Sequence, residues 1–204
     1  AARFDLIQVA LLDAFSATAA GLHGLAESYL YTVEAVKVYL DHLRPGGLLA
    51  ITRWVTLPPR DALKLFATAV AVLEAQGVAD PGTRLAMIRG WKTVTLLVKN
   101  GPFTPDEIAA IQAFCAARAF DPVWYPGMTP DAANRYNVLD RPYFYEGVAA
   151  LLSGEVDVME PVPVQDIDRI NAAPNARVVA GPELRTIFLG MDQKRDELLF
   201  SNIK

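Results

Sequence analysis

Residues 4–12 constrain the fold of this chain more than any other segment. They form the sequence FDLIQVALL and are apolar at nearly consecutive positions, a pattern typical of a β-strand covered on both faces of a parallel sheet. Asp13 ends the run, a helical pattern follows, and a second short apolar run occupies 48–51. A strand, a helix and a strand in this order predict a parallel β-α-β unit, and therefore an α/β fold.

Capping residues locate the helices between these strands. Thr32 can N-cap a helix over 33–43 that has Glu34 in its first turn. The sequence PGG at 45–47 is expected to stop that helix as a glycine C-cap. A second helix is expected after the two prolines at 58–59.

The middle of the chain adds an antiparallel element. Two strand-like runs, 85–88 and 93–98, flank the turn RGWK and predict a hairpin. The sequence TPDE at 104–107 carries a capping box and a proline at the first helical position, which together predict a helix start. That helix is expected to present Phe114 and Cys115 on one apolar face. We therefore predict an incomplete half sheet of parallel strands plus an antiparallel hairpin.

The composition excludes several classes of protein. Of the 204 residues 52% are hydrophobic, and the net charge of −4 argues against a nucleic-acid or anionic membrane surface. The single cysteine permits no internal disulfide. Because the chain also has only two histidines, few residues could bind a metal, and we expect none. The apolar runs are far shorter than the roughly 20 residues that cross a bilayer. Asp5 and Gln8 interrupt the N-terminal run, so no export signal is expected, which favours the cytoplasm.

Six strings in the first three quarters of the chain carry a family resemblance. They are RFDLIQ at 3–8, LDAFSA at 12–17, ESYLYTVEA at 27–35, LDHLRPGG at 40–47, ITRW at 51–54 and ANRYN at 133–137. On these strings, residues 3–152 resemble the C-terminal half of spermidine-synthase-like proteins, which have the class I S-adenosylmethionine-dependent methyltransferase fold. The resemblance implies a Rossmann-like methyltransferase-fold half over residues 1–152. It also implies a transferase that uses S-adenosylmethionine or its decarboxylated form.

The same resemblance implies site residues. Asp13 matches a carboxylate at the end of a strand that accepts a proton from the attacking amine; an aspartate that only caps the following segment is the structural alternative. Where the family has a second carboxylate for the cationic end of a diamine, this chain has Ser16, and a hydroxyl cannot supply that charge. Tyr31 and Arg53 are predicted to contact the substrate, with packing as their alternative.

Three other side chains with reactive groups have simpler interpretations. His23 falls in the loop after Asp13, where it is either catalytic or exposed without a role. His42 is expected to be a favourable charge near a helix C-terminus. Cys115 is expected to be a thiol in the core, because it lies on an apolar helix face with no histidine nearby in the sequence.

The glycine pattern that binds the cofactor in this fold is absent from the sequence. Neither G-x-G-x-x-G nor G-x-G-x-G occurs in the 204 residues, although such a loop, at the start of a helix, is the usual floor for a nucleotide-like cofactor. The cofactor-binding residues are therefore unknown. We expect the chain to be inactive unless another segment or chain supplies that half.

The last quarter of the chain has a different resemblance. AALLSGEVDV at 149–158 and GPELRTIFLGMD at 181–192 look like a stretch of peptide-type extracellular solute-binding proteins of ABC importers. This implies a small α/β appendage over 153–204. It also leaves two alternatives to a transferase, which are a fragment of a peptide-binding importer component and a non-catalytic fusion product.

The absence of a cofactor-binding half also predicts an interaction. In the complete fold the strand at 4–12 would have neighbours on both sides, so one of its edges is expected to be free, and few polar side chains protect it. A homodimer, or the missing N-terminal half, is expected to pair with this edge. The alternative is that predicted strands at 177–179 and 184–189 cover it within the same molecule.

Overall fold

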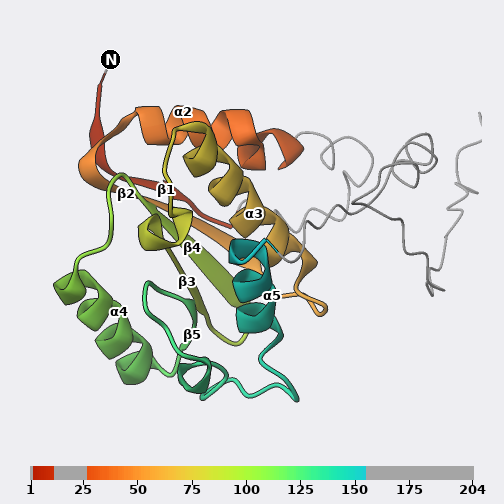
Figure 1. Ribbon diagram of the computed structural model, residues 1–204. Helices are drawn as coiled ribbons and strands as arrows, with labels where there is room; N and C mark the ends of the chain where they lie inside the picture. The colour runs from red at the N-terminus through yellow and green to blue at the C-terminus, as the bar shows by residue number, and fades with distance from the viewer. Residues whose placement is uncertain (1, 12–26, 155–204) are drawn as a thin grey trace, which may run out of the picture. The chain divides into compact units, whose positions relative to one another are not determined.

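The computed structural model describes residues 2–11 and 27–154, all within the first of the two units into which the chain divides, Ala1–Glu160 (Figure 1). Five strands of this unit form one sheet in the order β1-β2-β4-β3-β5. They are β1 (Phe4–Val9), β2 (Leu43–Trp54), β3 (Leu85–Arg89), β4 (Thr93–Lys99) and β5 (Asp121–Trp124). β1 and β2 are parallel, whereas the other neighbouring pairs are antiparallel.

This strand order confirms the predicted fold class. β3 and β4 form the expected hairpin, with Arg89 opposite Val94, and β4 also pairs with β2, with Arg53 opposite Val94. β1, β2 and β3 therefore all run in the same direction. The chain is α/β, with an incomplete Rossmann-like half sheet of parallel strands plus an antiparallel hairpin. Of the predicted appendage at 153–204, all but the first two residues lie outside the described part of the chain.

Helices cover the two faces of the sheet unequally. The helices are η1 (Glu27–Tyr31), α2 (Val33–Asp41), α3 (Arg60–Ala75), η2 (Pro81–Arg84), α4 (Pro105–Arg118), η3 (Pro130–Ala132) and α5 (Tyr143–Leu152). α2, α3 and α5 pack on one face and form the main core with it, where Phe66 of α3 is fully buried (Figure 1). α4 lies on the opposite face, over a smaller cluster around Ala86, Tyr125 and Met128.

Both predicted helix N-caps are confirmed. The Thr32 hydroxyl accepts a hydrogen bond from the Ala35 N–H and N-caps α2. At the start of α4, the Thr104 hydroxyl accepts from the Glu107 N–H, and the Glu107 carboxylate accepts from the Thr104 N–H. These reciprocal bonds satisfy backbone donors that the first turn of a helix leaves without partners.

α4 buries less of its surface than the sequence pattern predicts. Cys115 is its one buried residue among those described. Phe114 was expected on the same covered face but is exposed, and its ring tilts against that of Phe120 with 5.6 Å between centroids. The prediction is therefore wrong for Phe114, whose ring contacts Phe120 and the Arg118 guanidinium and stays exposed to solvent.

The PGG sequence does not end a helix. α2 already ends at Asp41, and residues 45–47 lie within β2, where a bulge shifts the register toward β1. Gly46 has a φ of +77°, and a Cβ on Gly47 would lie 3.0 Å from the Phe4 carbonyl oxygen. The predicted glycine C-cap is wrong: these glycines permit a β-bulge and the close approach of two strands.

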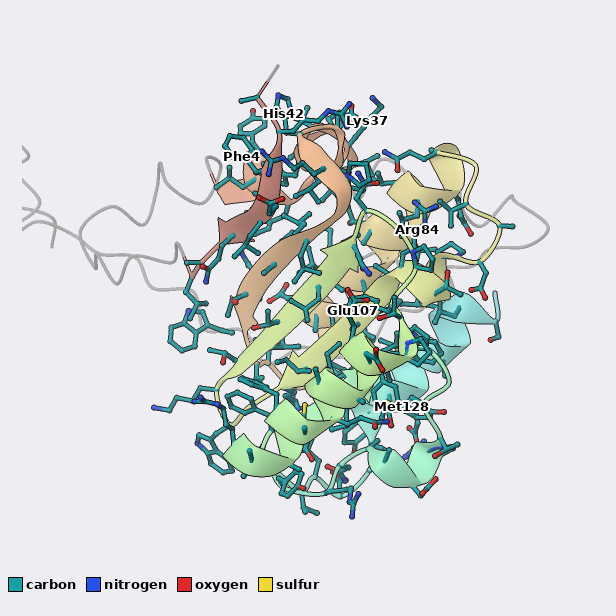
Figure 2. The ribbon with its side chains drawn as sticks, turned by 90° about the vertical axis from the view of Figure 1, so that its left-hand side faces the viewer. Phe4, Lys37, His42, Arg84, Glu107 and Met128 are labelled. Carbon is teal, nitrogen blue, oxygen red and sulfur yellow. The ribbon has the colours of Figure 1, made fainter. Side chains whose placement is uncertain are left out.

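β1 differs from the prediction in its length and in its surroundings. It spans Phe4–Val9 instead of 4–12, and among the described residues it pairs with β2 alone, at the edge of the sheet. Phe4 is 49% exposed and Leu6 55%. The prediction of a strand covered on both faces is wrong, because α4 lies over the other half of this face and no described helix lies in front of β1 and β2 (Figure 2).

Candidate functional site

The carboxyl ends of β1, β2 and β3 lie at one edge of the sheet, because the three strands run in the same direction. Open α/β sheets bind their ligands at this edge. Arg53 lies near the end of β2 and Tyr31 at the end of η1, and the Arg53 Cζ is 4.3 Å from the centroid of the Tyr31 ring. The structure thus brings together two of the four predicted site residues. The other two, Asp13 and Ser16, lie outside the described residues.

Arg53 reaches Tyr31 because of the alternation of side chains along β2. Leu49 and Ile51 are fully buried in the main core, on the face that α2 and α3 cover. Arg53 is the next alternate residue, so it continues this face at the end of the strand. Its guanidinium then lies over the face of an aromatic ring, which is a favourable cation–π contact.

The Tyr31 ring is itself held by its neighbours. It is partly buried against the main core. Tyr39 of α2 donates its hydroxyl hydrogen to the Leu30 carbonyl at 3.3 Å, which ties η1 to the helix that follows it. Burial, and to a smaller extent the nearby Tyr31, raises the pKa of Tyr39 above its ordinary value, so Tyr39 stays a neutral donor. Contact of Tyr31 and Arg53 with a substrate remains a prediction.

The tip of the β3–β4 hairpin lies at the same edge, although the sequence patterns do not single it out. The Val55 N–H donates to the Lys92 carbonyl at 2.8 Å, which joins the tip to the segment after β2. Trp91 and Lys92 are both exposed, Trp91 to 76%. Neither residue has a positive φ, so the turn itself does not require these residue types. An indole and an ammonium group are therefore presented beside the end of β2.

A tight contact at Gly90 fixes this tip. The Gly90 N–H donates to the Thr93 carbonyl at 2.8 Å and closes the hairpin. A Cβ on Gly90 would lie 2.7 Å from the ring of Phe120, closer than van der Waals contact allows. Residue 90 needs to be glycine because the Phe120 ring occupies the space that any side chain there would need.

A buried ion pair joins the end of β3 to the start of β5. Arg89 is 4% exposed and Asp121 1%, and the Arg89 Nη2 donates to the Asp121 Oδ2 at 3.0 Å. The same nitrogen donates to the Asn137 carbonyl at 2.6 Å. The Arg89 guanidinium also lies over the Phe144 ring, 5.1 Å from its centroid. Sequence reasoning missed this pair, whose members are 32 residues apart.

Asp121 also binds the backbone of a loop. The N–H groups of Arg135, Tyr136 and Asn137 donate to its carboxylate at 2.6, 2.8 and 2.7 Å. Burial by itself raises the pKa of Asp121, but these hydrogen bonds outweigh it and hold the pKa below the ordinary value. Burial lowers the pKa of Arg89, and Asp121 opposes that effect. Both groups are therefore charged at neutral pH.

This arrangement anchors the loop and is not a ligand site. Asn134 ties the loop to itself, since its side chain donates to the Leu139 carbonyl at 2.8 Å and accepts from the Leu139 N–H at 2.7 Å. The cavity beside the ion pair has a volume of about 10 Å³, which is room for about one water molecule. The string ANRYN at 133–137 marks this loop in the sequence, but nothing in it indicates which carboxylate the loop binds.

The remaining candidates are structural where they are described. His42 is the C-cap of α2, with its Nδ1 2.8 Å from the Val38 carbonyl oxygen, which confirms its predicted place at a helix C-terminus. Cys115 is a core thiol, as predicted; burial, and then the charge of Asp121, raises its pKa to about 11. His23 lies outside the described residues. Within residues 2–11 and 27–154, no group of three or more His, Cys, Asp or Glu could hold a metal ion.

None of the described helices has both the length and the apolar character needed to cross a bilayer. Comparisons with known proteins found no matching family model, no matching curated protein and no matching solved structure. The strand order and the geometry at the carboxyl edge are therefore the observations on which a function can be argued.

Proposed function

We propose that this chain supplies the acceptor-binding half of a spermidine-synthase-like transferase that works with an S-adenosylmethionine-type cofactor. The observation that carries the proposal is the order β1-β2-β4-β3, in which a parallel pair is followed by an antiparallel hairpin whose second strand pairs with β2. This agrees with the half sheet that the family resemblance implies. The same resemblance implies the cytoplasm as the compartment.

The surroundings of β1 support the view that the sheet is one half of a larger one. A strand at a natural edge is usually protected by charges, proline or a covering element. β1 carries one charged residue, Asp5, and its carboxylate is already paired with Arg44 of β2 at 2.8 Å. Phe4 and Leu6 are about half exposed. β1 thus has the composition of an inner strand, although it lies at the edge of the sheet that the described strands form.

The residues at the carboxyl edge suit an acceptor better than they suit the cofactor. By the resemblance, Asp13 would accept the proton of an amine nucleophile. Tyr31 at the end of η1 and Arg53 near the end of β2 would contact the acceptor. The residues present do not fit the adenosyl cofactor by themselves, because the sequence contains no glycine-rich loop to receive it. We therefore assign the cofactor site to residues outside these 204.

The test is a calorimetric titration of the natural open reading frame that contains this chain. The ligands are S-adenosylmethionine, its decarboxylated form and methylthioadenosine. We expect binding heat with at least one of them, and none when the 204-residue chain is titrated alone. Absence of heat from all three ligands with the whole reading frame would contradict the proposal.

The free edge of β1 is, on this proposal, the place where the other half of the sheet pairs. The 204-residue chain alone should then assemble through this edge with a second copy. The Phe4 N–H donates to the His42 carbonyl at 2.9 Å, so by alternation the Ile7 N–H points away from β2. Ile7→Pro removes that outward donor. Light scattering after size-exclusion chromatography should show assembly that weakens in Ile7→Pro; assembly of equal strength in the variant would contradict the assignment.

A further inference from the structure

We infer that the tip of the β3–β4 hairpin and the C-terminal end of α4 together form a docking surface for an acidic segment of another protein. This surface, which we call the aromatic–cation patch, consists of five residues: Trp91, Lys92, Phe114, Arg118 and Phe120. Such docking is separate from the proposed transferase activity, and either could hold without the other.

Contacts between the two segments make the patch continuous. The Phe120 ring lies against the backbone of Gly90, since a Cβ on that glycine would be 2.7 Å from the ring. Trp91 is the next residue of the hairpin. On its other side the Phe120 ring tilts against that of Phe114, with 5.6 Å between centroids. The Arg118 guanidinium lies 5.1 Å from the Phe114 centroid, so rings and cations follow one another across the patch.

Most of these side chains are exposed to solvent. Trp91 is 76% exposed, and Lys92, Phe114 and Arg118 are exposed as well. Aromatic rings bury a large apolar area when a partner covers them. Tryptophan, phenylalanine and arginine are enriched in protein interfaces, where tryptophan and arginine often contribute most to affinity. The patch therefore has the composition of a protein-binding surface.

The charges of the patch favour an acidic partner. Within residues 2–11 and 27–154, neither Lys92 nor Arg118 forms an ion pair. The acidic residues of α4 lie in its first turn, at the opposite end of the helix from Arg118, where Figure 2 shows Glu107. A second copy that docked through the same patch would place like charges against each other. Charge complementarity therefore assigns the patch to a partner that carries carboxylates.

Hydrogen bonds hold the end of α4 in place before any partner binds. The Phe120 N–H donates to the Cys115 carbonyl at 3.0 Å and fixes the chain where it leaves the helix. The Asn137 side chain donates to the Ala119 carbonyl at 3.0 Å, which ties the same segment to the loop at 133–137. A surface that is already ordered loses less conformational entropy on binding.

The test selects peptides from a random library displayed on phage, with the 204-residue chain as the bait. We expect the selected peptides to be net negative and to contain apolar or aromatic residues. Their affinity, measured by fluorescence anisotropy, should fall about ten-fold or more in Trp91→Ser and in Arg118→Gln. The matched controls are Tyr29→Ser, since Tyr29 is 75% exposed, and Lys64→Gln, on the exposed side of α3. Both controls should leave the affinity unchanged.

Three results would overturn the docking surface: no selected peptide, peptides that are neutral or basic, or equal losses of affinity in the control variants. Oligothymidylate and phosphatidylserine vesicles are titrated in parallel, because rings beside cations also suit single-stranded nucleic acid and membrane interfaces. Binding of either that is tighter than that of the peptides and is lost in Trp91→Ser would overturn the assignment to a protein. Each variant replaces an exposed side chain, so equal thermal unfolding midpoints would show that the losses arise at the patch.

Discussion

The two ends of the sheet differ in how they are covered. At the β5 end, which we call the closed end, helices cover both faces and the buried Arg89–Asp121 pair fixes the loop at 133–137. At the β1 end, which we call the open end, one face has no described helix over it and an apolar strand lies at the edge. The closed end can enclose the charges of Arg89 and Asp121 because the two groups pair with each other and hydrogen-bond the backbone of residues 135–137. The open end leaves Phe4 and Leu6 half exposed. Among the described residues, the sheet is thus covered on both faces at the β5 end and on one face at the β1 end.

The burial of individual strands shows the same contrast. β3 is buried at all but one of its residues, whereas β1 is exposed at four of six. Both sequences are rich in apolar residues, so composition does not cause the difference. Neighbours cause it: β3 pairs on both sides, with β4 and β5, whereas β1 pairs among the described residues with β2 alone. Substitutions at the two ends should therefore have very different costs.

Removal of Asp121 should have the largest effect on stability. Asp121→Ala would leave Arg89 buried without a counter-charge and three N–H groups without an acceptor. Breaking a buried pair from one side costs about 3–5 kcal/mol. The matched change at the open end, Asp5→Ala, breaks the exposed pair with Arg44 and should cost about 0–1 kcal/mol. Urea unfolding of both variants measures the difference, and equal costs would contradict the contrast between the ends.

Two leucines on opposite faces of the β1–β2 pair test the open face directly. Leu49 is fully buried under α2 and α3, and Leu49→Ala should lower the free energy of unfolding by about 2–5 kcal/mol. Leu6 is more than half exposed, and Leu6→Ala should cost less than about 1 kcal/mol in the monomer. Denaturant unfolding at low protein concentration gives both values. A loss for Leu6→Ala as large as for Leu49→Ala would show that this face is covered.

A glycine at the closed end should be intolerant of the smallest side chain. In Gly90→Ala the new methyl group would lie 2.7 Å from the Phe120 ring, so the ring or the hairpin has to move. Overpacking of this kind costs about 1–3 kcal/mol. Thermal unfolding should show the loss, and adding Phe120→Leu should restore part of it. If the double variant is no more stable than Gly90→Ala, the clash with the ring is not the cause.

Acid should weaken the closed end through Asp121. Its pKa is lower in the folded chain than in the unfolded chain, so its contribution to stability is fully present above about pH 3.9, the ordinary pKa of aspartate. That contribution is lost as the pH falls through the lower pKa of the folded state. Urea unfolding of the wild type and of Asp121→Asn should therefore converge below about pH 4. If the difference in free energy of unfolding between the wild type and Asp121→Asn stays constant below about pH 4, this assignment is contradicted.

Features set by residues close together in the sequence could be predicted. Thr32 and the capping box at 104–107 each depend on a few consecutive residues, and both were confirmed. The hairpin follows from two strand-like runs around a short turn. The glycines at 46–47 were misassigned because a bulge needs a partner strand, and that partner, at Phe4, is far away along the chain.

The site could be predicted only residue by residue. Tyr31 and Arg53 were singled out separately, and no spacing in the sequence shows that one side chain lies over the other. The Arg89–Asp121 pair was missed for the same reason, since its members belong to strands that meet only in the folded sheet. Lys92 was passed over as part of a turn, because its place at the carboxyl edge depends on the pairing of β4 with β2.

The central claim is that β1 is an open edge of the sheet. Amide hydrogen exchange of β1, measured in the monomeric fraction, is the most direct test of this claim. The Phe4 N–H donates to the His42 carbonyl, so the alternating donors of Leu6 and Gln8 should face β2, and those of Asp5 and Ile7 should face outward. By NMR we predict slow exchange at Leu6 and Gln8 and fast exchange at Asp5 and Ile7. Uniformly slow exchange at all four amides in a monomer would contradict the account, because it would mean that the edge is already covered within the chain.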